Sequence, residues 1–446
     1  MTATISHETS ELSPRGAERD ARQGVADEHA IKPSEMAVGV IIGRASEYFD
    51  FFVYGIASVL VFPAVFFPLL DRLEGTLWSF VIFSFAFIAR PIGSVAFMAI
   101  QKKYGRGVKL TAALFLLGVS TAGMAFLPNY ASLGATSIVL LSIFRFAQGI
   151  ALGGSWDGLS SLLAMTAPRH RRGWYAMIPQ LGAPVGFIIA AALFLYLNSQ
   201  LPAKDFLDWG WRYPFYVAFA INVVALFARL RLVVTNEYEH LLQKNQLEPT
   251  PVVELIKARG SNLFIGAFAA LASYALFHLV TVFPLSWITL YSNQSVNDVL
   301  LIQIIGAFIA IAGVIASGWI ADRFGRRNTL GTLAVLIGLF AIVAPLLLGS
   351  NVFGEDIFIL LGFALLGLSY GQAAGAVTSN FEAQYRYTGA ALTSDLAWLI
   401  GAAFAPLVAL GLSAHFGLAF MGAYLFSGAV CTLIALRVNK VLEIRG

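Results

Sequence analysis

Seven charged residues lie inside stretches of the sequence that are otherwise apolar. Three of them, Arg44, Glu47 and Asp50, fall in the segment GRASEYFDFFVYG at residues 43–55. The other four are spread along the chain: Arg90, Arg145, Asp157 and Asp395. An ionised side chain in an apolar environment is costly unless it is paired or reached by water. We therefore expect these residues to share one region of the folded protein.

The balance of these charges predicts chemistry in which a proton takes part. Three arginines stand against four acids, so the set carries one surplus negative charge when every group is ionised. One proton would cancel that surplus, and withdrawal from water favours the protonated form of a carboxylic acid. We predict that the acids carry a proton, with Asp50 favoured, Glu47 second, and Asp157 and Asp395 as further candidates.

The arginines indicate an anionic ligand. The planar guanidinium group of Arg90 or Arg145 matches the two oxygens of a carboxylate. Side chains of the same apolar stretches are predicted to complete this binding site: Tyr54, Trp156, Gln180 and His278.

Structural roles remain open for the same residues. The acids at 47 and 50 could form an internal ion-pair stripe with Arg44, because positions three apart share a helix face. Arg90 could brace its neighbouring helix, and Asp157 could pair with another arginine. His278 could hydrogen bond between helices. Aromatic side chains could face lipid.

The elements that position these residues are predicted to be membrane-spanning helices. Hydrophobic residues make up 58% of the 446, charged residues 12%, and the mean hydropathy is +0.76. A soluble chain needs about twice that charged fraction. Apolar runs of roughly 20 residues indicate an all-α integral membrane protein with twelve transmembrane helices. The predicted spans are 36–66, 77–100, 108–128, 133–166, 173–198, 212–232, 261–291, 298–321, 328–349, 354–381, 388–412 and 414–437.

The positive charges predict the orientation of these spans. Of 29 Lys and Arg residues, 23 fall in the segments on the side of the N-terminus, three fall on the opposite side and three lie within spans. Lys and Arg accumulate on the cytoplasmic side of membrane proteins, so we expect both termini in the cytoplasm. Residues 1–35 carry eleven charges and no apolar segment, which predicts a disordered cytoplasmic tail without a signal peptide. Residues 438–446 are predicted to form a second cytoplasmic tail.

Two function classes are disfavoured by composition. The net charge of +4 is distributed in short patches between apolar runs, which suits membrane topology and predicts no nucleic-acid partner. Cys431 is the only cysteine, so the chain has no intrachain disulfide and no cysteine-based metal site. We expect no metal and no cofactor.

An internal repeat divides the chain into two halves. The segment KKYGRGVKL at 102–110 follows the second span, and DRFGRRNTL at 322–330 follows the eighth, an offset of 220 residues. The longest polar connector, residues 233–260, separates six spans from six and is predicted to be a cytoplasmic linker. We predict two six-helix bundles, 36–232 and 261–437, with a ligand site between them at the middle of the membrane.

At this point the sequence resembles the major facilitator superfamily. SGWIADRFGRR at 317–327 is similar to the loop motif of that superfamily, and RFAQGIALGG at 145–154 is similar to its span-4 motif. Within the superfamily the chain most resembles the metabolite:proton symporters, whose members take up organic acids or zwitterionic osmolytes. The segments behind that choice are EYFDFFVYG at 47–55, ARPIGS at 89–94, RRGWYAMIPQLGAPVG at 171–186 and GWRYPF at 210–215.

Four segments depart from the pattern of this family. Lys102 and Met98 stand where the first-half loop motif has Asp and Gly. In the fourth span Ser155 replaces the usual Glu, and Asp157 follows two residues later. Asp395 stands in the eleventh span where Gln is expected, and TNEYEH at 235–240 lacks the usual proline. These departures affect the prediction of the substrate more than the prediction of the fold.

The loop motif implies a conformational latch for the outward-open state. Asp322 is expected to meet the N-terminal end of a neighbouring helix, since a carboxylate is stabilised there. The arginines are expected to hold the inner leaflet and acidic partners. The predicted latch residues are Gly318, Asp322, Arg323, Gly325, Arg326 and Arg327. Lys102, in place of the corresponding Asp, predicts that the latch is asymmetric.

The resemblance implies a transporter rather than an enzyme. We expect proton-coupled uptake of a small mono-, di- or tricarboxylate, or of a zwitterionic osmolyte, by a monomer in a bacterial inner membrane. A proton-coupled exporter, a sugar importer and a non-transporting sensor on the same fold are the alternatives. The chain contains no GxxxxGK[ST] pattern, so direct coupling to ATP is not expected.

Overall fold

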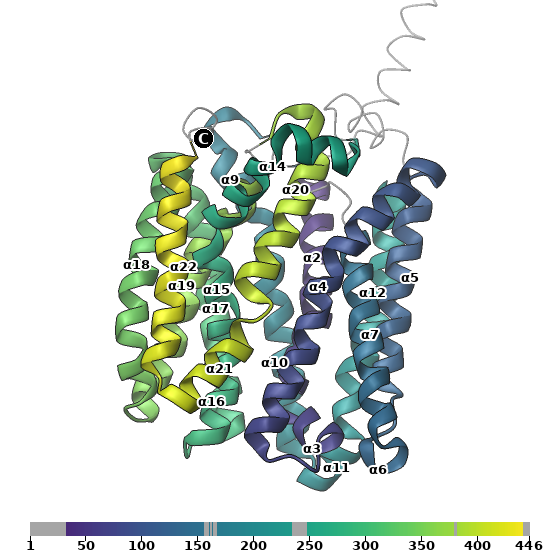
Figure 1. Cartoon of the computed structure of the whole chain (residues 1–446), viewed down its shortest axis with the longest axis vertical. Coiled ribbons are helices and arrows are strands. Elements are labelled where there is room, and N and C mark those ends of the chain that lie inside the picture. Colours follow the sequence, from purple (N-terminus) through teal and green to yellow (C-terminus); the bar gives the residue numbers. More distant parts are fainter. Residues whose placement is uncertain are drawn as a thin grey trace, which may run out of the picture.

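The computed structural model describes residues 33–155, 160, 163, 167–233, 248–378 and 381–439, and these residues form helices and short connections (Figure 1). Ten helices or helix pairs in this part of the chain are long and apolar enough to cross a membrane. Two further helices, α2 (Pro33–Leu60), which carries three of the charges discussed above, and α12 (Tyr213–Val233), pack against each other and against helices among these ten.

The N-terminal half contains six of the predicted spans. After α2, its helices are α3 (Phe62–Phe66), α4 (Arg72–Tyr104), α5 (Arg106–Ala125), α6 (Tyr130–Leu133), α7 (Ala135–Gly154), η1 (Arg169–Arg171), α9 (Arg172–Met177), η2 (Ile178–Leu181), α10 (Gly182–Gln200), α11 (Ala203–Asp208), η3 (Gly210–Arg212) and α12.

The C-terminal half contains the other six. Its helices are α14 (Val252–Ala269), α15 (Leu271–Thr281), α16 (Phe283–Tyr291), α17 (Val296–Phe324), α18 (Arg326–Leu348), α19 (Val352–Thr378), α20 (Ala383–Ala397), the π-helix η4 (Trp398–Ala402), α21 (Ala405–Phe416) and α22 (Ala419–Val438).

Each of the twelve predicted spans contains one helix or one broken helix, and most of residues 156–166 of the fourth predicted span lies outside the described residues. The predicted connector at 233–260 is helical from Val252 onward, and α14 has a kink at Arg259, just before the predicted start of the seventh span. The predicted N-terminal tail overlaps the described residues only at 33–35, where α2 begins. The remainder of both predicted tails and residues 234–247 of the connector lie outside the described residues.

Three crossing helices are interrupted near prolines. Pro179 lies in η2 between α9 and α10, Pro284 begins α16, and Pro406 begins α21 after the π-helix. Proline has no backbone N–H to donate, so a helix commonly ends or bends where it occurs. A π-helical turn inside an α-helix occurs frequently at functional sites. Here it contains Trp398, which lines the pocket described below.

The two halves repeat the same close helix contacts. In the N-terminal half α4 packs on α7, and in the C-terminal half α17 packs on α19. Gly149 on α7 lies so close to α4 that a Cβ atom there would stand 2.2 Å from the carbonyl oxygen of Ala86. Gly367 on α19 is equally restricted, because its Cβ would stand 2.4 Å from the carbonyl oxygen of Ala310 on α17.

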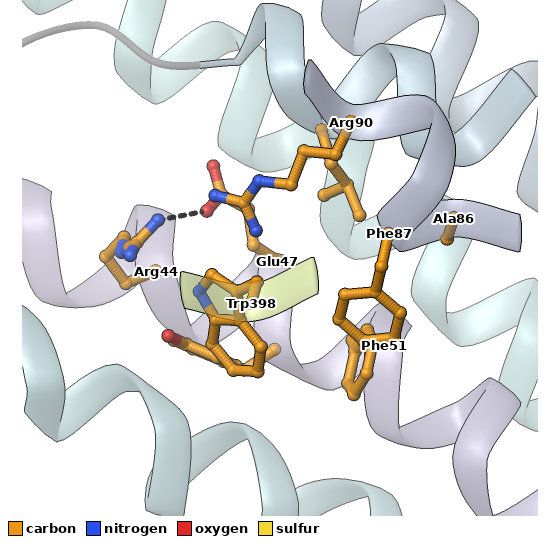
Figure 2. A pocket seen from close by; sticks show the side chains of 9 residues that line it. Arg44, Glu47, Phe51, Ala86, Phe87, Arg90 and Trp398 are labelled. Atoms are coloured by element: carbon orange, nitrogen blue, oxygen red, sulfur yellow. Dashed lines mark hydrogen bonds and ion pairs between the residues drawn. The ribbon is translucent and has the colours of Figure 1, made fainter. Parts of the chain in front are cut away.

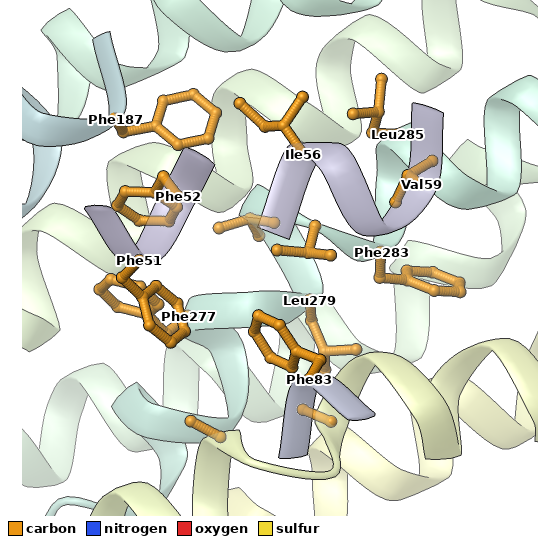
Figure 3. Packing of buried hydrophobic residues seen from close by; sticks show 14 of the residues in the cluster. Phe51, Phe52, Ile56, Val59, Phe83, Phe187, Phe277, Leu279, Phe283 and Leu285 are labelled. Carbon is orange, nitrogen blue, oxygen red and sulfur yellow. The ribbon is translucent and has the colours of Figure 1, made fainter. Parts of the chain in front are cut away.

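An apolar cluster fills the interior and spans both halves. Figure 3 shows Phe51 and Phe52 of α2 beside Phe277 of α15, with Phe83 of α4 close by. The rings of Phe52 and Phe277 are stacked with their centroids 5.6 Å apart. Helix α2 therefore buries an aromatic face against the opposite half. Along the sequence Glu47 and Asp50 are about one helical turn or less from Phe51, and Arg44 is about two turns away.

Candidate functional site

A pocket of about 410 Å³, counted with its opening, lies where α2, α4 and α7 meet the π-helix of the opposite half (Figure 2). It combines two guanidinium groups, one carboxylate and several aromatic rings. Its lining residues are Arg44, Glu47, Tyr48, Phe51, Ala86, Phe87, Arg90, Leu152 and Trp398. A second pocket, of about 290 Å³, is lined mainly by apolar side chains of α2, α10, α15, α17 and α19.

One ion pair in the first pocket lies within the N-terminal half. Arg44 Nη1 is 2.8 Å from Glu47 Oε2, and the two side chains are 15% and 11% exposed. Ser155 Oγ donates a hydrogen bond to the other oxygen of Glu47 at 2.9 Å. The carboxylate of Glu47 is thus held between its own helix and the end of α7.

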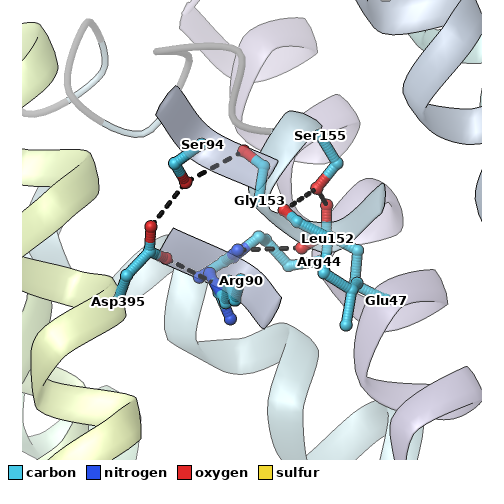
Figure 4. Close-up of polar contacts among 8 residues, drawn as sticks. All are labelled: Arg44, Glu47, Arg90, Ser94, Leu152, Gly153, Ser155 and Asp395. Atoms are coloured by element: carbon cyan, nitrogen blue, oxygen red, sulfur yellow. Dashed lines mark hydrogen bonds and ion pairs between the residues drawn. The ribbon is translucent and has the colours of Figure 1, made fainter. Parts of the chain in front are cut away.

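A second ion pair joins the two halves (Figure 4). Arg90 Nε on α4 is 2.7 Å from Asp395 Oδ1 on α20. Ser94 Oγ, one turn further along α4, donates to Asp395 Oδ2 at 2.5 Å and lies 3.2 Å from the carbonyl oxygen of Gly153. Asp395 is only 2% exposed, whereas Arg90 is partly accessible and lines the pocket.

Asp50 lies in a different network, inside the N-terminal half. Thr121 Oγ1 is 3.0 and 2.8 Å from its two oxygens, Gln148 Nε2 donates to one oxygen at 3.0 Å, and Asn222 Nδ2 donates to the other at 3.0 Å. Asn222 in turn accepts from Ser46 Oγ at 2.9 Å. Asp50 is 1% exposed, and these three hydrogen-bond donors are neutral side chains of the same half.

Arg145 is fully buried beside this network. Its Nη1 donates to Gln148 Oε1 at 2.5 Å, so Gln148 links the guanidinium group to Asp50. The guanidinium carbon lies 3.9 Å from the centre of the Tyr54 ring, a cation–π contact. Within the described residues Arg145 Nη2 and the hydroxyl of Tyr54 have no hydrogen-bond partner.

His278 is the residue of the C-terminal half that comes closest to this arrangement. It is fully buried, and its ring packs against those of Phe51 and Phe83, with centroids 5.1 and 5.2 Å away. Its Nδ1 is 3.4 Å from Thr281 Oγ1, and its Nε2 has no partner among the described residues. Gln180, in η2, is also buried but lines neither pocket.

The structure therefore divides the predicted charged set. Arg44, Glu47 and Arg90 line the pocket, with Asp395 directly behind Arg90. Asp50 and Arg145 lie together in the interior of one half. Asp157 of this charged set lies outside the described residues, and so does Trp156, which was predicted to belong to the binding site.

The predicted latch residue Asp322 contacts the opposite half at the end of the bundle where α9 begins. Its Oδ1 accepts from the backbone N–H of Gly173 at 2.6 Å and its Oδ2 from that of Trp174 at 3.1 Å. These amides belong to the first turn of α9, whose N–H groups have no partner within the helix. Gly318 permits this approach, because a Cβ there would stand 3.0 Å from the Cα of Trp174.

The other latch residues have different surroundings. Gly325 adopts a φ of +83°, which favours glycine. Arg326 is 8% exposed and donates to the carbonyl oxygens of Gly375 at 3.0 Å and Arg172 at 3.3 Å. This burial differs from the expectation that Arg326 holds the inner leaflet. Arg327 donates to the carbonyl oxygen of Leu436, and Arg323 is exposed beside Trp319.

The equivalent junction of the first half is built differently. Gly105 has a φ of +87°, almost the same as Gly325. Lys102, at the position equivalent to Asp322, is exposed. Instead Lys109 Nζ lies 3.0 Å from the hydroxyl of Tyr387 on α20, which donates to Gln101 Oε1 at 3.0 Å. Both junctions contact the opposite half, but through different chemical groups.

Several polar residues of the site were missed by reasoning from charge. Besides the two arginines, the partners of the acids are uncharged side chains: Ser94, Thr121, Gln148, Ser155 and Asn222. Gln148 and Asn222 are amides in strongly apolar helices, and this rarity was the available signal. In the described part of the chain, no group of three or more His, Cys, Asp or Glu residues could hold a metal ion.

Comparison with known proteins identifies the family. The family model of the Major Facilitator Superfamily matches residues 48–406. The chain belongs to this superfamily. An inner membrane metabolite transport protein, YhjE of Escherichia coli K12, is 36% identical over 90% of this chain and 93% of its own length. The shikimate transporter of the same organism is 29% identical over 85% of this chain and 88% of its own, and its proline/betaine transporter 27% over 88% and 80%.

A solved structure shows the same fold. The crystal structure of a D-xylose-proton symporter superposes with a TM-score of 0.68, covers 91% of this chain and 97% of its own, and is 18% identical. This major facilitator superfamily protein is therefore a multi-pass membrane protein of the twelve-helix fold, as its sequence predicted. It is a transporter of small molecules and not an enzyme.

Proposed function

We propose that this transporter takes up a small metabolite bearing a carboxylate, an organic acid or a zwitterionic osmolyte, together with protons and by alternating access. The observation that carries the proposal is the pocket between the halves, in which Arg44, Glu47 and Arg90 lie among aromatic rings. A guanidinium group binds a carboxylate through parallel hydrogen bonds. The rings of Tyr48 and Trp398 suit an apolar body or an ammonium group.

The relatives support this substrate class. Their names state shikimate, proline and betaine, and each of these compounds carries a carboxylate. An organic acid would use Arg90 and the rings of the pocket. A zwitterion would also place its positive charge towards Glu47 or the aromatic faces.

Buried carboxylates support coupling to protons. Asp50, Glu47 and Asp395 are each less than a tenth exposed, and Glu47 and Asp395 lie at or directly beside the pocket. The sequence favoured Asp50 as the carrier. The geometry adds a distinction, because Asp395 is paired with Arg90 of the opposite half, whereas Thr121, Gln148 and Asn222 hold Asp50 within its own half.

The latch and the orientation are part of the same proposal. The contacts from Asp322 to the start of α9 would be made and broken as the halves move, which is what a latch for one conformation requires. The distribution of Lys and Arg supports an orientation with both termini in the cytoplasm. The proposal further takes the chain to be a monomer in a bacterial inner membrane.

The experiment is an uptake screen with the full chain reconstituted in lipid vesicles. Labelled mono-, di- and tricarboxylates, betaine, proline and xylose are offered with an inward proton gradient, and then with the gradient dissipated by an ionophore. We expect at least one carboxylate-bearing compound to accumulate only with the gradient. Arg90→Gln should abolish this accumulation, whereas Arg259→Gln, a partly exposed arginine paired with Glu382 away from the pocket, should retain it.

Other outcomes would identify the alternatives. Gradient-driven expulsion indicates an exporter, accumulation of xylose alone indicates a sugar importer, and binding without accumulation indicates a sensor. Each of these three results would contradict the proposed function.

A further inference from the structure

The ion pair with Asp395 occupies the guanidinium group of Arg90, which a substrate carboxylate would need for its own binding. Arg90 Nε donates to Asp395 Oδ1 at 2.7 Å, while the same guanidinium group lines the pocket. A carboxylate in the pocket and the carboxylate of Asp395 therefore compete for one partner. The contact also ties α20 of one half to α4 of the other, so its rupture would loosen the boundary between them (Figure 4).

We propose that Asp395 is a proton-operated lock: protonation of Asp395 releases Arg90, and the carboxylate of the substrate takes the place of Asp395 on the guanidinium group. This inference rests on the proposed function for its substrate. It assigns to Asp395 a task that Asp50 cannot perform from its position inside one half.

The step balances in charge and atoms. In the locked state the positive charge of Arg90 and the negative charge of Asp395 cancel. A proton from water on the open side forms one O–H bond with an Oδ atom of Asp395, and the N–H···O contact with Arg90 breaks. The freed guanidinium group then pairs with the substrate carboxylate. Release of the proton on the other side restores the ion pair and displaces the substrate.

Obligatory coupling follows from the cost of an unpaired buried charge. A closed boundary with the substrate but without the proton would hold two carboxylates against one guanidinium group. A closed boundary with the proton but without the substrate would leave Arg90 unpaired. Both states are strongly disfavoured away from water. Closure therefore requires either the ion pair alone or the proton and the substrate together.

The groups around Asp395 single it out as the titrating group of this boundary. The positive charges that act on it are those of Arg90 and Arg44. Glu47 is held by Arg44 and Ser155 of its own half, whereas Asp395 forms its ion pair with Arg90 of the opposite half. The titratable or charged side chains on the other elements near α20 are Tyr274 and His278 on α15, Tyr370 on α19, Lys109 on α5, and Glu254 and Arg259 on α14.

Those side chains contact residues other than Asp395. Tyr274, Tyr370 and His278 pack around the ring of Trp398. Lys109, Glu254 and Arg259 contact Tyr387, Tyr385 and Glu382, near the start of α20. Tyr387, Tyr385 and Glu382 lie roughly 12 to 20 Å from Asp395 along the helix.

The test measures the separation of α4 and α20 without any substrate. Spin labels are placed on the exposed positions Lys103→Cys and Gln384→Cys in the full chain, with Cys431→Ser to remove the native thiol. Distances are measured in lipid nanodiscs from pH 8 to pH 5. We expect the open-to-closed ratio to rise with falling pH, by up to about tenfold per pH unit, because the open form binds one more proton.

Asp395→Asn is expected to abolish this pH dependence and to remain open throughout the range, since an amide cannot restore the ion pair. The matched control is Glu355→Gln, which removes a buried acid of α19 that is also hydrogen bonded by a serine, Ser292 at 2.9 Å. This control should follow the unaltered chain. Ser94→Ala keeps the acid but removes a donor, so it should raise the open-to-closed ratio roughly tenfold at pH 8.

Two results would overturn the proposal. One is an Asp395→Asn protein whose distances still change with pH as in the unaltered chain. The other, decisive if Asp395→Asn does not fold, is a Ser94→Ala protein with an unchanged ratio at every pH. Because no substrate is present, either result would leave the outcome of the uptake screen unaffected.

Discussion

Asp50 and Asp395 are both almost completely buried, at 1% and 2% exposed, yet they have opposite surroundings. Asp50 accepts hydrogen bonds from three neutral side chains of its own half. Asp395 is paired with a full positive charge, Arg90, and its partners belong to the other half. One acid is part of the interior of a bundle, and the other is part of the boundary between bundles.

This difference indicates which of the two buried acids can couple the binding of a proton to the movement of the two halves. Donors that surround Asp50 complete the hydrogen bonding of an ionised carboxylate, and they do not separate when the halves move as rigid units. The partners of Asp395 separate when the boundary opens. We therefore assign coupling to Asp395 and the placement of Arg145, through Gln148, to Asp50.

The largest expected effect comes from neutralising each acid in turn. Asp395→Asn should lower gradient-driven accumulation of the substrate found in the screen by about tenfold or more, while exchange at equal concentrations persists, because coupling is lost and binding is kept. Asp50→Asn should lower accumulation and exchange together, since it disturbs the interior. The comparison breaks if Asp50→Asn loses accumulation alone, which would make Asp50 the proton carrier.

The arginines extend the comparison. Arg90→Lys should weaken binding of a carboxylate substrate roughly tenfold and that of a neutral analogue little, because Lys cannot form the parallel hydrogen bonds. Arg145→Lys should instead lower thermal stability, as it removes the stacking on Tyr54 and a buried hydrogen bond. Isothermal binding and thermal unfolding in detergent measure the two effects. Equal loss of both ligands in Arg90→Lys would contradict a role in carboxylate binding.

The latch provides a second contact of the boundary. Asp322→Asn should weaken two hydrogen bonds to the start of α9, each worth about 1.5 to 3 kcal/mol when one partner is charged. Faster labelling of a cysteine introduced near Gly173 would report the opening. Lys102→Gln, at the exposed equivalent position, should label at the rate of the unaltered chain. Equal acceleration in both variants would contradict the asymmetric latch.

The smallest effect is expected from a single neutral donor of the interior. Thr121→Val removes the hydroxyl beside both oxygens of Asp50, which should cost about 1 to 3 kcal/mol of stability without changing the pH dependence of the α4–α20 distance. Thermal unfolding and the spin-label measurement check the two parts. A changed pH dependence would show that the interior network takes part in the movement.

Much of the fold could be predicted from the sequence, because membrane spans are long apolar runs whose meaning does not depend on distant contacts. The twelve spans and the repeat around Gly105 and Gly325 follow from such local patterns, and the two glycines adopt nearly the same φ. The helix over residues 252–260 was not predicted, because a polar connector has similar sequence features whether it is irregular or forms a helix at the end of a bundle.

The site could be predicted only in part. Charge in an apolar run identifies Glu47, Asp50, Arg90 and Asp395 as unusual, and all four are mostly or fully buried. Their partners depend on which helix faces turn towards each other, and this information is absent from a single span. Sequence reasoning therefore treated the charges as one set, whereas packing separates an interior network from a boundary pair.

The central claim, that substrate and proton enter together, is tested most directly by proton movement. Vesicles containing the full chain are suspended in weak buffer without any imposed gradient, with a potassium ionophore to prevent charge build-up, and the substrate found in the screen is added outside. The account predicts that the external medium becomes more alkaline as the substrate enters, and that Asp395→Asn vesicles show neither net entry nor alkalinisation, because the variant without substrate cannot close and return. Substrate entry with acidification, or with no change in pH in the unaltered protein, would contradict it.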